Sequence, residues 1–290
     1  MSRTMVISPI ISALLKSEDI LGKNRTWRAV NDWQELFLEK FFSKKAELAG
    51  FSKKELRNWA SFSAQELNRI LQREGFDIRL GDFRPEEFGV VSILDVMAEW
   101  LKEGLEIVVV SLGKKYPGVR MEPDSKFEAY TSPSYPHPVA ALPAKSGDKV
   151  FMAVVDGKAA SFSLIEKIDS IRKNLMPGGY YDSLKFPMID INQEVPLDWL
   201  LGLRTLQDDG RQAEISQAFQ QTKFKMNQYG ARARSAVALG AFKAAIRDER
   251  AFLIDKPFFL WIEREGMSIP VIYAYIDQED WKNPGNLSEM

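Results

Sequence analysis

The segment that most constrains the fold lies near the C-terminal end of the chain, at Phe252-Leu-Ile-Asp-Lys-Pro-Phe-Phe-Leu-Trp-Ile262. Pro257 has a fixed φ and favours a turn, and the side chain of Asp255 can bond to the local backbone. Phe258, Leu260 and Ile262 follow at every second residue, so an extended chain places all three on one face. The segment therefore predicts a tight turn followed by an aromatic strand in a hydrophobic core.

The composition excludes several functional classes. The 290 residues are 45% hydrophobic and 27% charged, which is enough apolar material for a large core. The net charge of −1 provides no basic surplus for a nucleic-acid partner. The chain has no cysteine, and its one histidine, His137, lies in a proline-rich stretch that we expect to be a surface loop. Without a nucleotide-binding or hydrolase motif as well, we expect no enzymatic activity, no catalytic residues, no cofactor and no metal.

The first residues resemble the start of a secretory signal, because Arg3 precedes the apolar run from 5 to 15. Ser8, Pro9 and Ser12 interrupt that run, and no cleavage site follows it. Elsewhere no stretch approaches the length of uncharged apolar sequence that spans a bilayer. These features predict a cytoplasmic protein with no signal peptide and no membrane partner.

The hydrophobic periodicity changes at Gly104. Before it, apolar residues three and four apart predict helices from Trp27 to Phe41, around Leu67, and from Ser92 to Gly104. The second of these helices has Ser63 and Glu66 as a capping pair and Gly75 as its stop. After Gly104 strands dominate, with candidates at 105–112, 149–155, 184–191, 222–226, 252–262 and 268–276, and short helices at 163–173 and 196–203.

This order of elements predicts an α+β fold in a single domain over residues 1–290. Residues 1–104 form its mainly helical part and residues 105–290 its mainly β part. The β-branched run at 105–112 is typical of a strand buried on both faces, and we expect it in one large sheet with 222–226.

Five segments, in the same order, resemble conserved parts of the serpins. The C-terminal segment resembles the serpin signature in which an Asp-basic-Pro-Phe turn leads into a buried strand, although any core strand that begins at a proline is an alternative. The other four segments are 6–15, 138–155, 186–203 and 215–230, the last ending Phe224-Lys-Met-Asn-Gln-Tyr-Gly230. The chain is thus identified as a member of the serpin superfamily. It is called shortened because almost no sequence precedes segment 6–15, and the stretch between that segment and residue 105 is short for the family.

The resemblance implies a large central, mostly antiparallel sheet, helices from the N-terminal half, a second β-barrel-like sheet region and an exposed reactive loop at about 231–251. Members of the family have a tryptophan beyond the third strand of the large sheet. This tryptophan is missing at 105–116, where the resemblance would place it. A serpin inhibits a serine or cysteine protease by offering this loop as bait. After cleavage the loop enters the sheet as a new strand and traps the acyl-enzyme.

Three sets of residues follow from the resemblance. The hinge of the loop corresponds to Gln228, Tyr229, Gly230, Ala231, Ala233 and Ser235. The shutter-like residues, at the point where the sheet opens, are Ser8, Ser12 and Gln220. Two ways of counting the loop give different bait bonds, so the candidates are Lys243, Ala244, Ala245, Ile246 and Arg247.

An inserting strand must place small side chains beneath the sheet at every second position. Ala231, Ala233 and Ser235 satisfy this condition, while Arg232 and Arg234 have the opposite parity. A flexible Ala/Gly linker with incidental arginines is the alternative.

Departures from the family pattern favour a second function. Gln228 replaces the hinge glutamate, Gln220 replaces the shutter histidine, and the first helix of the family is expected to be absent. A non-inhibitory binding or scaffold protein with the serpin fold is therefore the alternative to a protease inhibitor. The sequence does not define the target protease or the oligomeric state.

Overall fold

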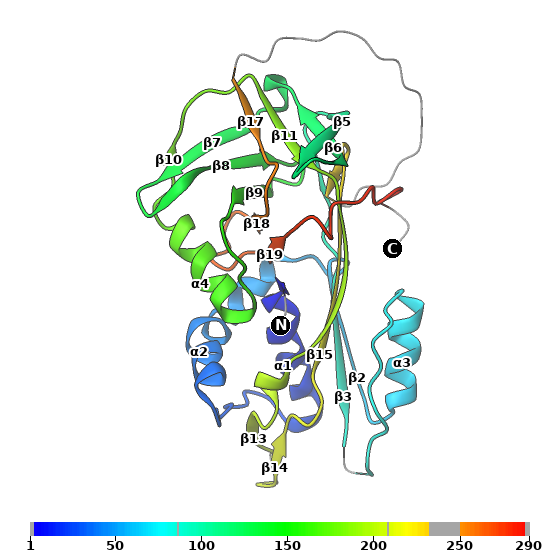
Figure 1. Cartoon of the computed structure of the whole chain (residues 1–290). Helices are drawn as coiled ribbons and strands as arrows, with labels where there is room; N and C mark the ends of the chain where they lie inside the picture. Colours follow the sequence, from blue (N-terminus) through cyan, green and yellow to red (C-terminus); the bar gives the residue numbers. More distant parts are fainter. Residues whose placement is uncertain (1–2, 86, 208, 232–249, 288–290) are drawn as a thin grey trace.

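The computed structural model describes residues 3–85, 87–207, 209–231 and 250–287. Several β-sheets form the fold, with helices on both sides of the strands (Figure 1). The helices are α1 (Ile7–Leu21), α2 (Asp32–Lys40), α3 (Ala64–Arg73) and α4 (Ser161–Arg172), with 3₁₀ turns η1 (Phe42–Gly50), η2 (Pro123–Ser125) and η3 (Asp198–Leu200). None of the helices in these described ranges is long and apolar enough to cross a membrane.

The largest sheet has seven strands in the order β1-β19-β18-β9-β8-β7-β10. Each pair of neighbouring strands in this sheet is antiparallel. Its strands are β1 (Thr4–Met5), β7 (Glu128–Ser132), β8 (Tyr135–Pro143), β9 (Lys149–Val154), β10 (Met176–Pro177), β18 (Phe258–Glu263) and β19 (Ile272–Ile276). His137 belongs to β8, so the prediction of a surface loop there was wrong, because this stretch pairs with β7 as a hairpin.

A second sheet has the order β17-β11-β6-β5 and lies at the opposite end from α2 (Figure 1). It consists of β5 (Leu105–Ser111), β6 (Lys114–Met121), β11 (Ser183–Pro187) and β17 (Ala251–Leu253). Neither of these two sheets closes into a barrel within the described ranges, since each has two edge strands.

The remaining strands form the split sheet. One part has the order β12-β15-β16-β4, with β4 (Ala98–Glu99), β12 (Ile189–Pro196), β15 (Phe219–Met226) and β16 (Gly230–Ala231). The other is the antiparallel pair of β2 (Leu56–Ser61) and β3 (Gly89–Leu94). A small hairpin, β13 (Arg204–Leu206) with β14 (Gln212–Glu214), lies beyond the end of β15 (Figure 1).

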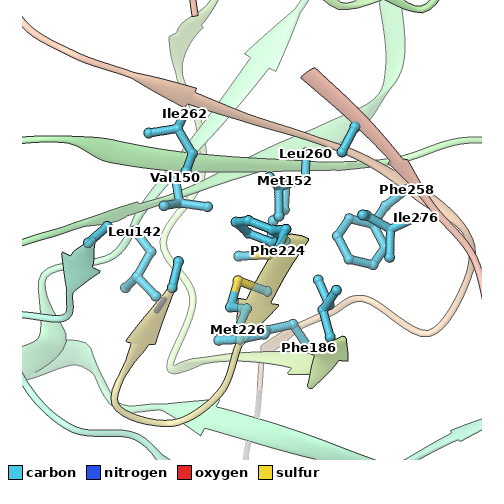
Figure 2. Packing of buried hydrophobic residues seen from close by; sticks show 14 of the residues in the cluster. Leu142, Val150, Met152, Phe186, Phe224, Met226, Phe258, Leu260, Ile262 and Ile276 are labelled. Carbon is cyan, nitrogen blue, oxygen red and sulfur yellow. The ribbon is translucent and has the colours of Figure 1, made fainter. Parts of the chain in front are cut away.

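The aromatic strand near the C-terminus joins two hydrophobic layers. Phe258, Leu260 and Ile262 pack in one cluster, together with Phe224 from the split sheet (Figure 2). Phe259 and Trp261 of the same strand pack on its other face, in a cluster that contains the buried side of α1. The alternation predicted from the sequence is confirmed, and β18 is buried on both faces.

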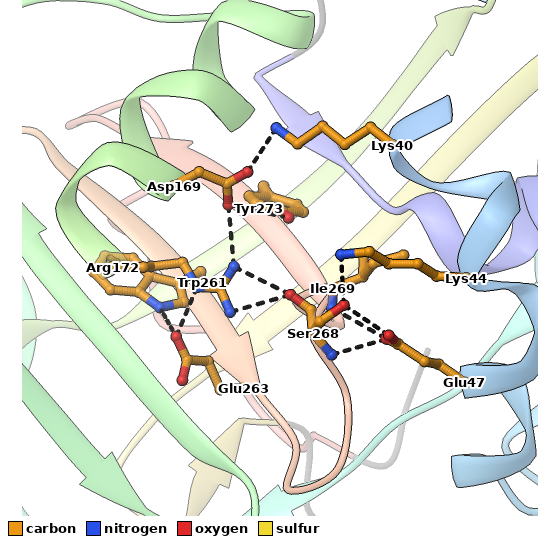
Figure 3. A network of polar contacts seen from close by, with 10 residues as sticks. All are labelled: Lys40, Lys44, Glu47, Asp169, Arg172, Trp261, Glu263, Ser268, Ile269 and Tyr273. Carbon is orange, nitrogen blue, oxygen red and sulfur yellow. Dashed lines mark hydrogen bonds and ion pairs between the residues drawn. The ribbon is translucent and has the colours of Figure 1, made fainter. Parts of the chain in front are cut away.

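Ion pairs attach the helices to the large sheet. Lys40 at the end of α2 pairs with Asp169 of α4 at 2.8 Å. Arg172, one turn further along α4, donates through Nε to Glu263 of β18 at 2.7 Å (Figure 3). These contacts fix α2 and α4 against the strand that carries the C-terminal signature.

The helix with the capping pair forms as predicted. Ser63 accepts a hydrogen bond from the backbone N–H of Glu66 at 3.2 Å, and α3 ends shortly before Gly75. Leu67 and its apolar neighbours on α3 pack against Val91 and Ile93 of β3. The helix therefore covers the outer face of the β2–β3 pair (Figure 1).

Two predictions about the middle of the chain were wrong. Residues 92–104 do not form a helix, because they extend β3 and then β4, which pair with β2 and β16. Residues 105–112 do form a strand, but β5 is the edge of a different sheet from β15 and is largely exposed. The strand that faces β15 in the split sheet is instead the β3–β4 stretch, and Trp100 directly follows it.

Candidate functional site: a cleft in the split sheet

The split sheet contains a cleft between β15 and β3. Outside the cleft, β15 pairs with β12 over its full length and β3 pairs with β2. Residues of both inner edges, Gln220 to Lys225 and Gly89 to Leu94, line one cavity of ≈ 1020 Å³. The two parts of the sheet therefore lie side by side, and no strand of the described residues lies between them (Figure 1).

One end of the cleft is already closed by a short strand. Ala231 of β16 pairs with Met226 of β15 on one side and with Ala98 of β4 on the other. Both pairings are antiparallel, so β15 and β4 run in the same direction and β16 runs against them. A strand that continued β16 beyond Ala231 would enter the cleft in antiparallel orientation to both walls.

The position of β16 requires a glycine. A Cβ on Gly230 would lie 2.5 Å from the carbonyl oxygen of Ala98 and 3.0 Å from Cα of Glu99. These are backbone atoms of a buried strand, so they have little freedom to move away. The hinge glycine predicted from the sequence is thus explained by close packing of two backbones.

Helix α1 forms the floor of the cleft and contacts both walls. Gln220 of β15 donates through Nε2 to the carbonyl of Val6 at 2.8 Å, directly before α1. Ser12 of α1 donates to Oδ1 of Asn58 in β2 at 2.9 Å. Ser8 is also buried, and none of the described residues forms a hydrogen bond with its hydroxyl. The three shutter-like residues therefore lie where α1 meets the split sheet.

A strap of residues 75–81 crosses the outer side of the cleft, from the end of α3 to β15. Asp77 donates its backbone N–H to Oε1 of Gln221 at 2.7 Å, and Gln221 donates back to the carboxylate of Asp77 at 3.0 Å. Lys223 donates to the carbonyl of Gly75. The bond from Gln221 and the charge of Lys223 hold the pKa of Asp77 below its ordinary value of 3.8.

The walls carry buried polar atoms that make no hydrogen bond among the described residues: Thr222 Oγ1 on β15, Ser92 Oγ on β3 and Arg57 Nε on β2. Buried hydroxyls are normally paired, and an unpaired one is destabilising. The cleft therefore has a mixed polar and apolar lining that contains unsatisfied polar atoms.

The hinge is held by the segment that follows β4. The N–H of Trp100 donates to the carbonyl of Tyr229 at 3.1 Å, and that of Gly104 donates to the carbonyl of Gln228 at 2.8 Å. Gln228 is buried and donates through Nε2 to Glu106 at 2.6 Å. Ala233, Ser235 and all bait-bond candidates, 243–247, lie outside the described residues.

Sequence reasoning missed the second wall of the cleft. Residues 92–104, which include the end of β3 and all of β4, were assigned to a predicted helix, so Ser92 was interpreted as a helix cap and Trp100 as part of a helical face. The signal was present in the β-branched stretch Gly89-Val-Val-Ser-Ile-Leu94, whose buried positions alternate. Among the described residues no group of three or more His, Cys, Asp or Glu is arranged to hold a metal ion.

No family model matches the sequence, and no curated protein matches it. Solved structures do match. Serpin48, a highly specific serpin of the insect Tenebrio molitor, superposes with a TM-score of 0.56 at 15% identity, covering 94% of this chain and 90% of that chain. The mouse protein-Z dependent protease inhibitor gives a TM-score of 0.52 at 12% identity, over 93% and 96%. Thyroxine-binding globulin in complex with thyroxine gives 0.54 at 12% identity, over 93% and 98%.

These similarities establish that the chain has the serpin fold. The matched structures include a protease inhibitor and a protein that binds thyroxine. The fold alone therefore does not separate inhibition from ligand binding.

Proposed function

We propose that the protein is a serpin-type inhibitor of serine or cysteine proteases, and that it is not itself an enzyme. A target protease would cleave the loop at about 231–251, and the freed loop would enter the cleft as a new strand. The observation that carries this proposal is β16: Gly230 and Ala231 already lie between the two walls, at one end of the empty strand position.

The register of β16 predicts how the loop would insert. Met226 faces Ala231, so continuation of the same pairing would set Ala233 beside Phe224 and Ser235 beside Thr222. Directly opposite residues point to the same face, and Phe224 and Thr222 are both buried. Small residues are thus required at 233 and 235, as the sequence provides.

Insertion would also provide a hydrogen-bond partner for a buried polar atom of the cleft. Ser and Thr side chains that face one another across an antiparallel pair can share a hydrogen bond. The hydroxyl of Ser235 is therefore expected to become the partner of Thr222 Oγ1, which has none among the residues that the structure describes. This is a stabilising contact available only to the inserted form.

The energetics allow trapping of an enzyme. From Gly230 to Ile246 an extended chain spans roughly 50 Å, enough to cross the sheet. About ten new ladder hydrogen bonds, at about 1 kcal/mol each, would supply on the order of 10 kcal/mol. The intact form would then be metastable and protected by a kinetic barrier.

The bait bond determines the class of target. Lys243 or Arg247 would suit a trypsin-like enzyme with a carboxylate in its specificity pocket. Ala244, Ala245 or Ile246 would suit an elastase-like or subtilisin-like enzyme. Identification of the cleaved bond by mass spectrometry distinguishes these candidates.

Incubation with a panel of serine and cysteine proteases tests the inhibitory function. We expect a complex with at least one protease that survives SDS. Ala233→Arg should convert the inhibitor into a substrate, because an unpaired charge beneath the sheet costs several kcal/mol. Arg232→Glu is the matched control with the opposite parity and should retain the complex. Equal loss in both variants would contradict insertion in this register.

A non-inhibitory binding protein is the second candidate. The observation that favours it is the anchored hinge, since Gln228 is buried and bonded to Glu106 rather than free to move. Thyroxine-binding globulin shows that the fold also serves ligand binding. Cleavage of the loop by every protease in the panel, without a stable complex, would support this function over inhibition.

A further inference from the structure

The outer edge of β5 is an unprotected strand edge. β5 is the last strand of its sheet, and within the described ranges no strand pairs with its far side. It joins β6 through Leu112 and Gly113, whose φ values of 48° and 76° are typical of a two-residue type I′ turn. In such a hairpin Ser111 and Lys114 exchange hydrogen bonds. The peptide groups of Glu106, Val108 and Val110 therefore point outward.

The side chains along this edge are unusually apolar for a surface. Val108 is 59% exposed, Val110 is 54% exposed, and Leu112 at the turn is 92% exposed. A leucine is energetically disfavoured at positive φ. In the single chain the exposed side chain of Leu112 makes no packing contact with the described residues that would offset this backbone strain. Proteins usually protect a free edge with prolines, bulges or several charges. β5 has seven residues with Glu106 as its one charged group, so it resembles a pairing edge.

We propose that β5 pairs antiparallel with β5 of a second copy of this chain, across a two-fold axis at Val108. The two four-stranded sheets would then form one continuous sheet. Val108 would face Val108 of the second copy, and Glu106 would face Val110. All seven residues of each strand take part in this register, and the exposed valines are covered.

The charges favour this register over its neighbours. Lys115 of β6 lies directly opposite Val110, on the same face. In the proposed pairing Val110 separates Lys115 from Glu106 of the second copy, a distance that a lysine side chain can cross. An axis at Glu106 would instead place two carboxylates side by side, which is destabilising. An axis at Val110 would leave the first half of each strand unpaired.

The interface leaves the proposed inhibitory site accessible. β17, which follows the 232–249 segment, is the other edge strand of the same sheet. The cleft lies in the separate split sheet. Glu106 is shared with the hinge, because it also accepts a hydrogen bond from Gln228. The variants used below leave Glu106 unchanged, so failure of the dimer does not imply failure of the proposed function.

Cysteine cross-linking tests the register, since the chain contains no cysteine of its own. Val108→Cys would place two thiols opposite one another, with Cα atoms about 5.5 Å apart, which is suitable for a disulfide. Val110→Cys is the matched control, because the two copies of residue 110 would lie roughly 13 Å apart along the strands. We expect a covalent dimer of V108C only. Equal cross-linking of both variants, or of neither, would overturn the proposal.

Sedimentation velocity over a concentration series tests the reversible dimer. The wild-type chain should dimerise, and Val108→Lys should raise the dissociation constant at least about tenfold, because two like charges would meet on the axis. Leu253→Lys, at a 46% exposed position on the opposite edge strand, should leave it unchanged. A wild-type chain that stays monomeric up to millimolar concentration would overturn the proposal, as would equal weakening by both substitutions.

Discussion

At the scale of the residue, the most informative side chain is Thr222. It is 6% exposed on the wall of the cleft, and its hydroxyl has no hydrogen-bond partner in the described part of the chain. Thr205 provides a comparison, because it is 2% exposed and its hydroxyl donates to the carbonyl of Thr26 at 2.8 Å. The same residue type is therefore satisfied at one buried position and unsatisfied at another.

Replacement of each threonine by valine should give opposite results. Thr222→Val removes an unsatisfied hydroxyl and should raise the free energy of unfolding of the intact protein by about 1 kcal/mol. Thr205→Val leaves the carbonyl of Thr26 without its donor and should lower it by about 1 kcal/mol. Urea unfolding of the two variants measures both values. A destabilised T222V protein would show that the hydroxyl is satisfied in the intact form.

At the scale of the element, the strap of residues 75–81 is the main obstacle to a strand entering the cleft from its outer side. It is attached to β15 through two hydrogen bonds between Asp77 and Gln221. Each bond is worth about 1 kcal/mol, and 1 kcal/mol of barrier corresponds to about fivefold in rate.

Release of the strap should accelerate loop insertion. In Gln221→Ala we expect the stable form to appear at least about fivefold faster after the loop is cut, without a change in its final stability. Gln65→Ala, at an exposed position of α3, is the control. The measurement is the rate at which thermal stability is gained after a brief proteolytic cut. An unchanged rate in Q221A would show that the strap does not limit insertion.

The β18–β19 hairpin is attached to the segment before β2 through an ion pair. Arg264 donates to Glu55 at 2.7 Å. Burial raises the pKa of Glu55, but hydrogen bonds from Arg264 and Ser52 outweigh this effect and hold it below the ordinary value of 4.5. A carboxyl whose pKa is lowered by folding stabilises the native state above its unfolded pKa, and this stability is lost as the pH falls through the folded pKa.

The loss of folding stability at acid pH should therefore depend on Glu55. Between pH 6 and pH 3 the free energy of unfolding should fall less steeply in Glu55→Gln than in the wild-type protein. Glu103→Gln, at an exposed carboxylate, should have the wild-type slope. The check is urea unfolding at a series of pH values, and identical slopes in all three proteins would contradict the assigned role of the pair.

Local patterns in the sequence predict some helices and strands correctly and others wrongly. The turn and strand at 252–262 and the capped helix at 63–75 are correct, because their patterns reflect local geometry. Ser92 and Asp95 imitate a helix cap, and Leu94, Met97 and Leu101 imitate a helical face. Pairing with β2 and β16, which are distant in sequence, determines the strands formed there instead.

The cleft and the exposure of β5 could not be predicted from the sequence, because they too depend on which distant strands pair. A β-branched run has the same composition whether it is central or at an edge, so 105–112 was placed in the wrong sheet. The cleft depends on the absence of a strand between β15 and β3, and no residue pattern specifies an absence. The resemblance to serpins pointed to Gly230, where close packing against the backbone of Ala98 requires a glycine, and its role as a hinge stays a prediction.

At the scale of the whole molecule, the central claim is that the intact protein holds an empty strand position. A cleft of ≈ 1020 Å³ separates two halves of a sheet that could be continuous. β16 occupies one end of this position, and its register leads into the rest. Under the proposed function, filling the position would complete the sheet and stabilise the cut protein.

Thermal melts before and after a single cut within residues 239–250 test this claim most directly. Mass spectrometry must first confirm that the chain is cut once and that both fragments remain together. The cut protein should melt at a much higher temperature than the intact one, because insertion adds on the order of 10 kcal/mol of stabilisation. An unchanged or lower melting temperature would contradict loop insertion while leaving the serpin fold in place.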